Sequence, residues 1–425
     1  MPELVLKSKT DFWELNIESV QNDAYWDLGD NKEYKIHGIH AYPAKFPAFI
    51  ATKAMEYAKK EGLQISIISD VFCGCGTVAL EAKLSGVDFW GCDINPVATL
   101  IASVKSSVYN KATLREYYEF VCAEYNCIYV DEADYKSANE RLQYWYYADN
   151  YCELLRLYKA ICKIPDLKYR KAFKCIFSSI LKATSKWLTK SIKPQIDLEK
   201  HPIKPKMAFD SQYVAFEKAA LTDTNLRSNI KIVQGSFLTE TNLPIVDIII
   251  TSPPYVTSYE YADLHQLSSL WLGYADDYKT LRKGTIGSMT PDSGDYLPRV
   301  KLNTTGEMIV AQLKENNDIS NSKVQAITRY YCDMQRVIER CYSMLNKGGL
   351  AFFIIGDTEY KGIKIYNSKH LIESLFDSGF SEVRVTKRTV SGKILTPYRD
   401  EKGKFTNDKN KRQIYHEEFV VIGRK

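Results

Sequence analysis

The stretch from Ile248 to Tyr255 constrains the fold of this chain more than any other. It reads Ile-Ile-Ile-Thr-Ser-Pro-Pro-Tyr, so an apolar β-branched run stops at polar residues, two prolines and an aromatic ring. Such a run is typical of a strand buried on both faces of a parallel sheet. Ligands of open α/β sheets bind beyond the carboxyl ends of the strands. Consecutive prolines restrict the backbone there, so little conformational entropy is lost when a ligand binds. We therefore predict that Ser252 to Tyr255 bind a flat ring that carries an amine.

A second buried strand, residues 65–72, ends in a glycine loop that leads into helix-like residues 78–85. The loop reads Asp70-Val71-Phe72-Cys73-Gly74-Cys75-Gly76-Thr77. Glycines let a backbone turn tightly and approach a ligand without a Cβ in the way, so this unit predicts the start of a Rossmann-type sheet with a cofactor at the loop. A nicotinamide dehydrogenase competes at this point, because Gly74, Gly76 and Ala79 satisfy the loose dinucleotide fingerprint.

The next predicted strand, residues 88–92, ends at Asp93. An acidic side chain at this place accepts hydrogen bonds from both ribose hydroxyls of an adenosine cofactor, which holds equally for NAD and for S-adenosylmethionine. Alternatively, Asp93 caps the helix that begins at Pro96, and the two roles are compatible.

Four further strand patterns, at residues 230–233, 350–355, 383–390 and 418–422, complete the sheet together with the opening strand, which spans residues 245–251. The last two read as an antiparallel hairpin. The chain is therefore predicted to be an α/β protein with a Rossmann-like sheet of seven strands, and residues 1–36 to be irregular. We divide it into a first half of the sheet domain at 1–103, a helical insertion at 104–228, and a second half at 229–425 with a loop excursion at 276–323.

The insertion carries a tyrosine cluster and a basic stretch. Residues 144–147 read Tyr-Trp-Tyr-Tyr and either pack between helices or stack on nucleotides. Lys182, Lys186, Lys190 and Lys193 recur every three or four residues, which predicts a basic ridge on one helix side that suits phosphate contacts; a solvated face is the alternative. A second basic excursion, residues 394–414, is either a hairpin loop or another surface for a nucleic-acid backbone. It contains Arg399, Lys402, Lys404, Lys409, Lys411 and Arg412.

Composition narrows the class of protein. The chain of 425 residues has a net charge of +5, which leaves room for a polyanionic partner without requiring one. Its ten cysteines show no paired C-x-x-C spacing, so reduced thiols are expected rather than a disulfide framework or a metal site. No signal-peptide pattern or membrane-length apolar run occurs, so we expect a cytoplasmic protein.

Two motifs together carry a resemblance to a known family. Phe72-x-Gly74-x-Gly76, followed downstream by Thr251-Ser252-Pro253-Pro254-Tyr255, resembles the exocyclic-amino DNA methyltransferases, which use S-adenosylmethionine to make N4-methylcytosine or N6-methyladenine. The resemblance covers the sheet elements from about residue 37 to the C-terminus but not the insertion. The pairing of the two motifs argues against a nicotinamide dehydrogenase. The aromatic stretch after the second motif is also similar to that family, at Tyr259, Tyr261, His265, Leu267 and Trp271.

The resemblance implies a cofactor site, residue by residue. Asp93 and Ile94 would hold the ribose, and Ser236 and Phe237 would border the adenine, although many relatives carry an acidic residue where Ser236 stands. The insertion falls earlier than the usual target-recognition domain of this motif order. Residues at the methionine end would be Tyr42, Lys45, Phe46, Asp70, Phe72, Gly74, Gly76 and Thr77.

The resemblance likewise implies that Ser252, Pro253, Pro254 and Tyr255 are catalytic. Ser252 Oγ and the Pro253 carbonyl would accept hydrogen bonds from the amine, and Tyr255 would stack on a flipped base. Ring-carbon methylation of cytosine would need a Cys, normally after a proline, and the chain has no Pro-Cys pair. Ser252 favours cytosine N4, since the adenine enzymes mostly carry Asp or Asn there.

The expected partner is double-stranded DNA, with a cognate restriction endonuclease as a further candidate. Three alternatives to a cytosine-N4 enzyme stay open: an adenine-N6 DNA methyltransferase, an RNA base-amine methyltransferase, and a catalytically silent nucleic-acid-binding scaffold.

Overall fold

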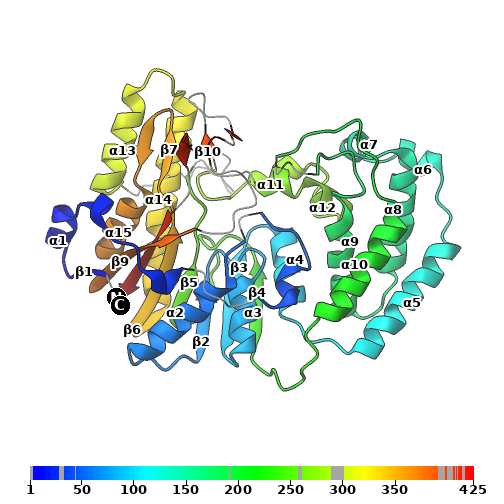
Figure 1. Ribbon diagram of the computed structural model, residues 1–425, viewed down its shortest axis with the longest axis horizontal. Coiled ribbons are helices and arrows are strands. Elements are labelled where there is room, and N and C mark those ends of the chain that lie inside the picture. Colours follow the sequence, from blue (N-terminus) through cyan, green and yellow to red (C-terminus); the bar gives the residue numbers. More distant parts are fainter. Residues whose placement is uncertain are drawn as a thin grey trace.

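The computed structural model describes residues 3–27, 33–43, 45–189, 191, 193–256, 261–288, 301–390, 398–399, 405–406, 408, 410–413 and 417–425. These residues form a body centred on a sheet and an all-helical lobe that extends from one side of it (Figure 1). No helix among the described residues is both long and apolar enough to cross a membrane.

The body is built on an eight-stranded sheet in the order β1-β9-β13-β6-β5-β2-β3-β4. Strands β4, β3, β2, β5 and β6 are parallel, whereas β13 runs antiparallel to both β6 and β9. This is a Rossmann-like sheet in which β13 alone of the seven predicted strands is reversed, and all seven are confirmed. The strands are β1 (Leu4–Leu6), β2 (Ile67–Asp70), β3 (Asp88–Asp93), β4 (Ile230–Gln234), β5 (Val246–Thr251), β6 (Leu345–Ile355), β9 (Glu382–Thr389) and β13 (Glu417–Arg424).

The eighth strand, β1, corrects the prediction that residues 1–36 are irregular. It pairs antiparallel with β9 at the sheet edge. Leu4 and Val5 are exposed and only Leu6 is buried, so three residues offered no alternation to detect. Helix α1 (Lys9–Glu14) and the 3₁₀ turns η1 (Ile17–Ser19), η2 (Ala24–Trp26) and η3 (Lys35–Gly38) follow.

Helices cover both faces of the sheet, which explains the continuous apolar run in β5. Ile248 and Ile250 pack in one core with residues of α2 and α3, whereas Ile249 packs in the opposite core with residues of α13, α14 and α15. Alternate residues of a strand point to opposite faces, so each face needs apolar side chains. The helices of the body are α2 (Ala48–Lys60), α3 (Thr77–Leu84), α4 (Pro96–Lys105), α11 (Tyr261–Leu264), α12 (Gln266–Trp271), α13 (Thr304–Glu315), α14 (Asn321–Met344) and α15 (Asn367–Asp377).

The helical lobe shares a third core with α4 and α12. Trp271 from α12 packs there against Tyr146, Tyr151 and Phe177, so the lobe is joined to the segment that follows the Ser-Pro-Pro-Tyr motif. Its helices are α5 (Lys111–Cys127), α6 (Glu132–Lys136), α7 (Glu140–Trp145), α8 (Ala148–Cys162), α9 (Leu167–Ile180) and α10 (Pro205–Ala219).

The predicted basic ridge on one helix side is wrong. Helix α9 ends at Ile180, and the chain then turns back so that buried Trp187 stacks on Trp145, with ring centroids 4.9 Å apart. Lys182 Nζ donates to the Ser191 carbonyl at 2.7 Å, so this amine holds the turn together. Lys190 lies outside the described residues.

Two predicted loop excursions contain regular structure. The stretch 276–323 includes η4 (Tyr278–Arg282), α13 and the start of α14, while residues 289–300 lie outside the described part. The basic excursion 394–414 contains a small antiparallel sheet of β10 (Tyr398–Arg399), β11 (Phe405–Thr406) and β12 (Arg412–Gln413). Lys402, Lys404 and Lys409 fall outside the described residues. A further hairpin joins β7 (Thr358–Tyr360) to β8 (Ile363–Ile365).

Candidate active site

The carboxyl ends of β2 and β5 meet at the centre of the sheet. The chain continues from β2 to β3 on one side, whereas β5 lies on the other, so these two strands flank the switch point where open α/β sheets bind ligands. Thr251 Oγ1 donates a 2.6 Å hydrogen bond to Asp70 Oδ1 across this point. Burial raises the pKa of Asp70 to about 7, and the bond from Thr251 opposes that rise. The two predicted motifs are thus in direct contact.

Three hydrogen bonds hold the Ser-Pro-Pro-Tyr motif against its surroundings. Ser252 Oγ donates to the Ile354 carbonyl of β6 at 3.0 Å, and the Tyr330 hydroxyl of α14 donates to the Pro254 carbonyl at 2.7 Å. The Tyr255 hydroxyl donates to Glu418 Oε1 of β13 at 3.1 Å. Because the only hydrogen of Ser252 Oγ is used in this way, that oxygen presents lone pairs to a ligand.

The two glycines of the loop after β2 have different surroundings. Gly74 has φ +46° and donates its N–H to Asp93 Oδ2 at 2.9 Å, and a Cβ there would lie 3.6 Å from the Tyr42 ring. At Gly76, with φ +75°, a Cβ would lie 2.5 Å from the Ala102 Cβ of α4. Packing of α4 therefore explains Gly76 without any ligand, whereas Gly74 faces the predicted site.

Asp93 lies at the carboxyl end of β3, next to this loop. Its carboxylate accepts the Gly74 N–H and, at 2.8 Å, the Asn95 N–H. The cap of α4 is Asn95, whose side chain accepts from Val97 N, so the helix-cap alternative for Asp93 is wrong. Burial raises the pKa of Asp93 to about 6.

Two buried polar atoms beside the loop lack a partner among the described residues. They are Thr77 Oγ1 at the start of α3 and Asn95 Nδ2 at the start of α4. A buried polar group without a hydrogen bond costs about 1–3 kcal/mol, so a polar ligand at this place would relieve both. Together with the Asp93 carboxylate, which is an acceptor, these groups fit a ligand that carries hydroxyl groups and further hydrogen-bond acceptors.

Tyr42 covers the glycine loop. Its ring stacks on His265 of the aromatic stretch, with centroids 5.0 Å apart and an interplanar angle of 27°, and also faces Tyr261 at 6.2 Å. Burial lowers the pKa of His265 to about 3, so the imidazole is neutral at pH 7. The structure thus brings these three rings to the loop, while Tyr259 lies outside the described residues.

The other predicted cofactor residues are placed less directly. Lys45 Nζ forms a 2.6 Å ion pair with Glu33, and Phe46 packs against the core that holds α2 and α3.

Phe237 is buried against Trp90, with ring centroids 6.4 Å apart. Gly235, just before Ser236, donates to the Asp93 carbonyl at 3.0 Å. Phe72 and Ile94 are half-buried beside Asp70 and Asp93. The contacts of all these residues with a cofactor stay predictions.

Sequence reasoning missed Gly356 and the pair Glu418 and Arg388. A Cβ at Gly356 would lie 3.0 Å from the Tyr255 ring, and Arg388 Nη1 lies 2.5 Å from Glu418 Oε2. A local pattern could have placed Gly356 at a strand end, since it directly follows the apolar run of β6. No local signal marks the other two.

The tyrosine cluster of the lobe is divided between core and surface. Trp145 and Tyr146 are buried, whereas Tyr144 and Tyr147 are 46% and 43% exposed. Lys186 Nζ lies 6.0 and 5.2 Å from the centroids of these two exposed rings. We call Tyr144, Tyr147 and Lys186 the lobe patch.

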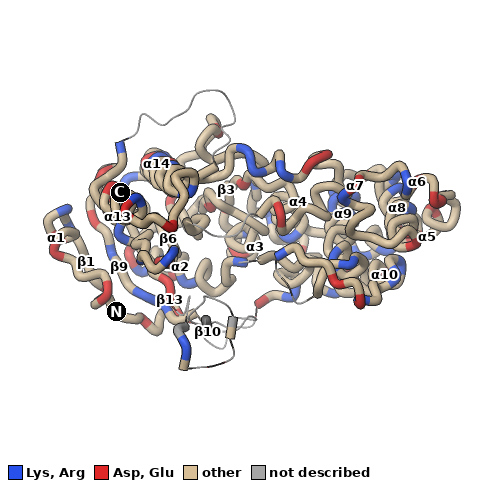
Figure 2. Tube along the Cα trace, turned by 90° about the horizontal axis from the view of Figure 1, so that it is seen from above, with Lys and Arg blue, Asp and Glu red and all other residues tan. Residues whose placement is uncertain are grey.

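One buried side chain joins the helical lobe, next to the lobe patch, to the aromatic stretch of the site. Gln266 Oε1 accepts from Arg141 Nε at 2.7 Å and from Trp145 Nε1 at 2.9 Å, and Gln266 directly follows His265. Figure 2 shows Lys and Arg interspersed with Asp and Glu over body and lobe, so basic charge is not confined to this patch.

Comparisons with known proteins find type II methyltransferases. The chain is 22% identical over 374 residues to M.MvaI of Kocuria varians, covering 80% of each chain. It is 22% identical over 428 residues to M.BsoBI of Geobacillus stearothermophilus, covering 84% of this chain and 80% of the relative. It is 35% identical over 97 residues to M.MjaII of Methanocaldococcus jannaschii, covering 22% and 18%.

The chain matches no protein-family model. Among solved structures, the rRNA methyltransferase aviRa of Streptomyces viridochromogenes covers 91% of this chain and 88% of its own, with 10% identity and a TM-score of 0.25. That likeness is too low to bear on fold or function. The long matches to type II methyltransferases, together with the sheet topology, support a methyltransferase.

Proposed function

We propose that this protein is a DNA methyltransferase of the type II kind, which transfers a methyl group from S-adenosylmethionine to the exocyclic N4 amine of cytosine in a specific duplex sequence. The observation that carries the proposal is the Thr251–Asp70 hydrogen bond of 2.6 Å. It joins the strand end that bears Ser-Pro-Pro-Tyr to the strand end that bears the glycine loop. A cognate restriction endonuclease is the expected partner of such an enzyme.

The residues around the glycine loop suit S-adenosylmethionine. The Asp93 carboxylate would accept from the ribose hydroxyls, and the open backbone at Gly74 would border the methionine end, beneath the Tyr42 ring. When bound, the sulfonium supplies a methyl group that is already activated for transfer. The protein therefore needs neither a metal nor a covalent nucleophile for this step, but it must align the acceptor nitrogen.

Ser252 and Pro253 would prepare that nitrogen. An exocyclic amine conjugated to its ring is a poor nucleophile, because its lone pair is delocalised. Ser252 Oγ, whose hydrogen goes to Ile354, and the Pro253 carbonyl would each accept one amine hydrogen. Two acceptors on one side of the nitrogen favour sp³ geometry and make the lone pair available. As the N–C bond forms, the methyl carbon–sulfur bond would break, the donor would leave as a neutral thioether, and one amine proton would pass to solvent.

Tyr255 would hold the base outside the duplex. Flipping a nucleotide costs on the order of a few kcal/mol, and stacking on an aromatic side chain returns roughly 1–3 kcal/mol. The lobe patch would contact the DNA beside this site, because cationic and aromatic side chains bind phosphates and bases with little sequence preference. Ser252 directs the proposal to cytosine by the resemblance stated above, with adenine N6 as the alternative.

A transfer assay tests the enzyme class. Purified protein and tritiated S-adenosylmethionine are incubated with mixed-sequence duplex DNA or with transcribed tRNA. We expect label in the DNA and none in the tRNA. Label in tRNA alone would support the RNA alternative, and label in neither, with the donor bound, would support a silent scaffold.

A further inference from the structure

We propose that Glu418, itself held by Arg388, positions the Tyr255 ring, so that the C-terminal hairpin sets the geometry of the base pocket. The inference rests on the proposed function, since it concerns the ring that would stack on the target base. Tyr255 and Glu418 are 163 residues apart, and their contact depends on the antiparallel placement of β13 beside β6.

Both oxygens of the Glu418 carboxylate are engaged. Oε1 accepts the Tyr255 hydroxyl at 3.1 Å and Oε2 faces Arg388 Nη1 at 2.5 Å. Glu418 and Arg388 are directly opposite each other in the β13–β9 register. A carboxylate bound at both oxygens cannot turn freely, so it fixes the point to which the phenol is tied.

Arg388 is buried and held on its other side as well. Its side chain is 2% exposed, Nε donates to the Trp26 carbonyl at 3.2 Å, and the guanidinium lies 5.4 Å from the Phe49 ring centroid. A buried cation needs its partners, because an unpaired charge in this position is strongly disfavoured. Arg388 therefore holds Glu418 in one place.

Gly356 forms the floor beneath the ring. It follows β6, and a Cβ there would lie 3.0 Å from Tyr255 Cε2, closer than side chains normally approach. The ring is thus bounded below by bare backbone and tied at its hydroxyl. Burial and the neighbouring Glu418 raise the pKa of Tyr255 well above its usual range, which keeps the phenol as a hydrogen donor.

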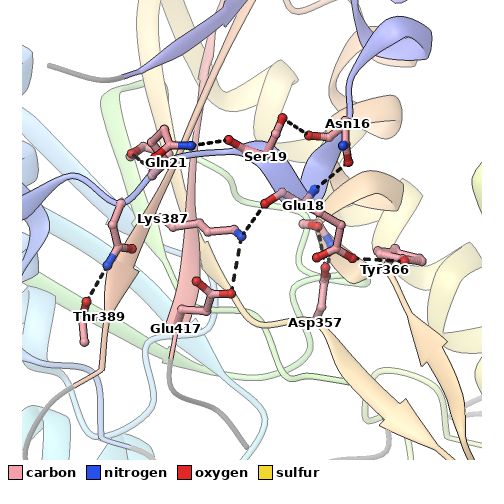
Figure 3. A network of polar contacts seen from close by, with 12 residues as sticks. Asn16, Glu18, Ser19, Gln21, Asp357, Tyr366, Lys387, Thr389 and Glu417 are labelled. Carbon is pink, nitrogen blue, oxygen red and sulfur yellow. Dashed lines mark hydrogen bonds and ion pairs between the residues drawn. The ribbon is translucent and has the colours of Figure 1, made fainter.

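The N-terminal segment braces the same hairpin from outside (Figure 3). Lys387 Nζ contacts the Glu18 carbonyl at 3.3 Å and Glu417 Oε1 at 3.4 Å, and Lys387 N donates to the Gln21 carbonyl at 3.0 Å. Alternate strand residues face opposite sides, so the Lys387–Glu417 pair lies on the face away from Arg388 and Glu418. It is an ion pair on the same two strands as Arg388 and Glu418, and it serves as the control.

The test compares Tyr255→Phe and Glu418→Gln with the control Glu417→Gln. We expect each of the first two to lower kcat about tenfold, the effect of losing one charge-assisted hydrogen bond, with the Kd for S-adenosylmethionine unchanged by calorimetry. In Glu418→Gln the single amide oxygen should turn to the buried Arg388, which leaves an NH2 group that cannot accept the Tyr255 hydroxyl. The double variant should therefore lose no more than the worse single variant, because both changes remove the same contact. Glu417→Gln should keep the wild-type kcat.

Tyr255→Phe leaves the Arg388–Glu418 ion pair intact, so its kcat tests the inference even if Glu418→Gln fails to fold. Wild-type kcat in Tyr255→Phe would overturn the inference, as would losses that multiply in the double variant. Equal loss in Glu417→Gln would show that only hairpin stability matters. If the wild type itself transfers no methyl group to DNA, the proposed function fails instead, and the two failures are distinguishable.

Discussion

The Thr251 hydroxyl and the Asp70 carboxylate are joined by a hydrogen bond of 2.6 Å between the ends of two adjacent parallel strands. Asp70 Oδ1 also accepts the Phe72 N–H at 3.1 Å, so the same carboxylate shapes the start of the glycine loop. One buried acid thus fixes the distance between the predicted donor loop and the predicted acceptor motif. That distance matters for the proposed methyl transfer, because a misplacement of about 1 Å between reacting groups can cost roughly a hundredfold in rate.

Thr251→Val removes the donor while keeping the shape of the side chain. We expect the free energy of unfolding to fall by about 1–3 kcal/mol, because a buried carboxylate loses a partner. The bond from Thr251 lowers the pKa of Asp70 below what burial alone would set, so the loss is larger above pH 7 than below it. Denaturant unfolding at pH 8 and pH 5.5 measures this. Thr251→Ser, which keeps the hydroxyl, is the control, and equal pH dependence in both variants would contradict the account.

Asp93 makes donor binding depend on pH. Burial raises the pKa of Asp93 to about 6, so the free protein takes up a proton as the pH falls through that value. A protonated carboxyl accepts ribose hydrogen bonds poorly, and the affinity for S-adenosylmethionine should fall by up to about tenfold per pH unit below pH 6. Calorimetric titration from pH 8 to pH 5 checks this. Asp93→Asn should bind weakly at every pH, and a retained slope in that variant would assign the titration elsewhere, with Asp70 the first candidate.

The two glycines of the loop should separate stability from binding. In Gly76→Ala the new Cβ meets Ala102 Cβ at 2.5 Å and its Cα at 2.7 Å, so α4 must shift. Overpacking of this kind costs about 1–3 kcal/mol, and we expect a lower Tm. In Gly74→Ala the Cβ meets Tyr42 at 3.6 Å and the Phe72 carbonyl oxygen at 3.9 Å, which are ordinary contacts, so strain comes only from the φ of +46°. This variant should lose less stability than Gly76→Ala and bind S-adenosylmethionine more weakly. Thermal unfolding gives the Tm of both variants, and calorimetry gives their affinity for S-adenosylmethionine. Equal Tm values in the two variants would contradict the packing explanation for Gly76.

The sheet was predictable because its seven strands other than β1 carry apolar residues, in a run as in β5 or in alternation as in β4, between turn residues. Strand β1 was not, since three residues carry no period and pair only through β9. The basic ridge failed for a related reason. Lys182, Lys186 and Lys193 have helical spacing, but the stacking of Trp187 on Trp145 turns the chain out of the helix after Ile180.

The local placement of Ser252 and Asp93 at strand ends was predictable because a motif marks each of them, while their roles with a base and a methyl donor stay predictions. The site was not predictable where distant strands meet. Glu418 and Arg388 come together through the β9–β13 register, and Gly356 matters only because the Tyr255 ring lies on it. Gly76 shows the converse, since a motif glycine that was expected to serve a ligand is required by helix packing.

Tyr255→Ala should abolish turnover while leaving the donor bound. Removing the ring loses the stacking contact of roughly 1–3 kcal/mol that would hold a flipped base, together with the tie to Glu418. The glycine loop and Asp93 are untouched. Single-turnover transfer and calorimetry measure the two effects, and an equal loss of donor affinity would show that the ring belongs to the donor site.

The lobe patch should contribute to DNA affinity through charge. Lys186→Ala should reduce the slope of log Kd against log salt by about one, the change expected for one phosphate contact. Lys168→Ala is the matched control, because Lys168 also lies over aromatic rings but lines a cavity that reaches Ile230, at the amino end of β4 and away from the site. Fluorescence anisotropy with a labelled duplex gives both slopes. Equal slopes in wild type and Lys186→Ala would remove the patch from the interface.

The product of the reaction shows whether the protein transfers a methyl group to an exocyclic amine of DNA. Mixed-sequence DNA is treated with the protein and S-adenosylmethionine, digested to nucleosides and analysed by mass spectrometry against standards. We expect N4-methyldeoxycytidine. N6-methyldeoxyadenosine as the sole product would contradict the choice of cytosine, and 5-methyldeoxycytidine would contradict the amine chemistry assigned to Ser252 and Tyr255.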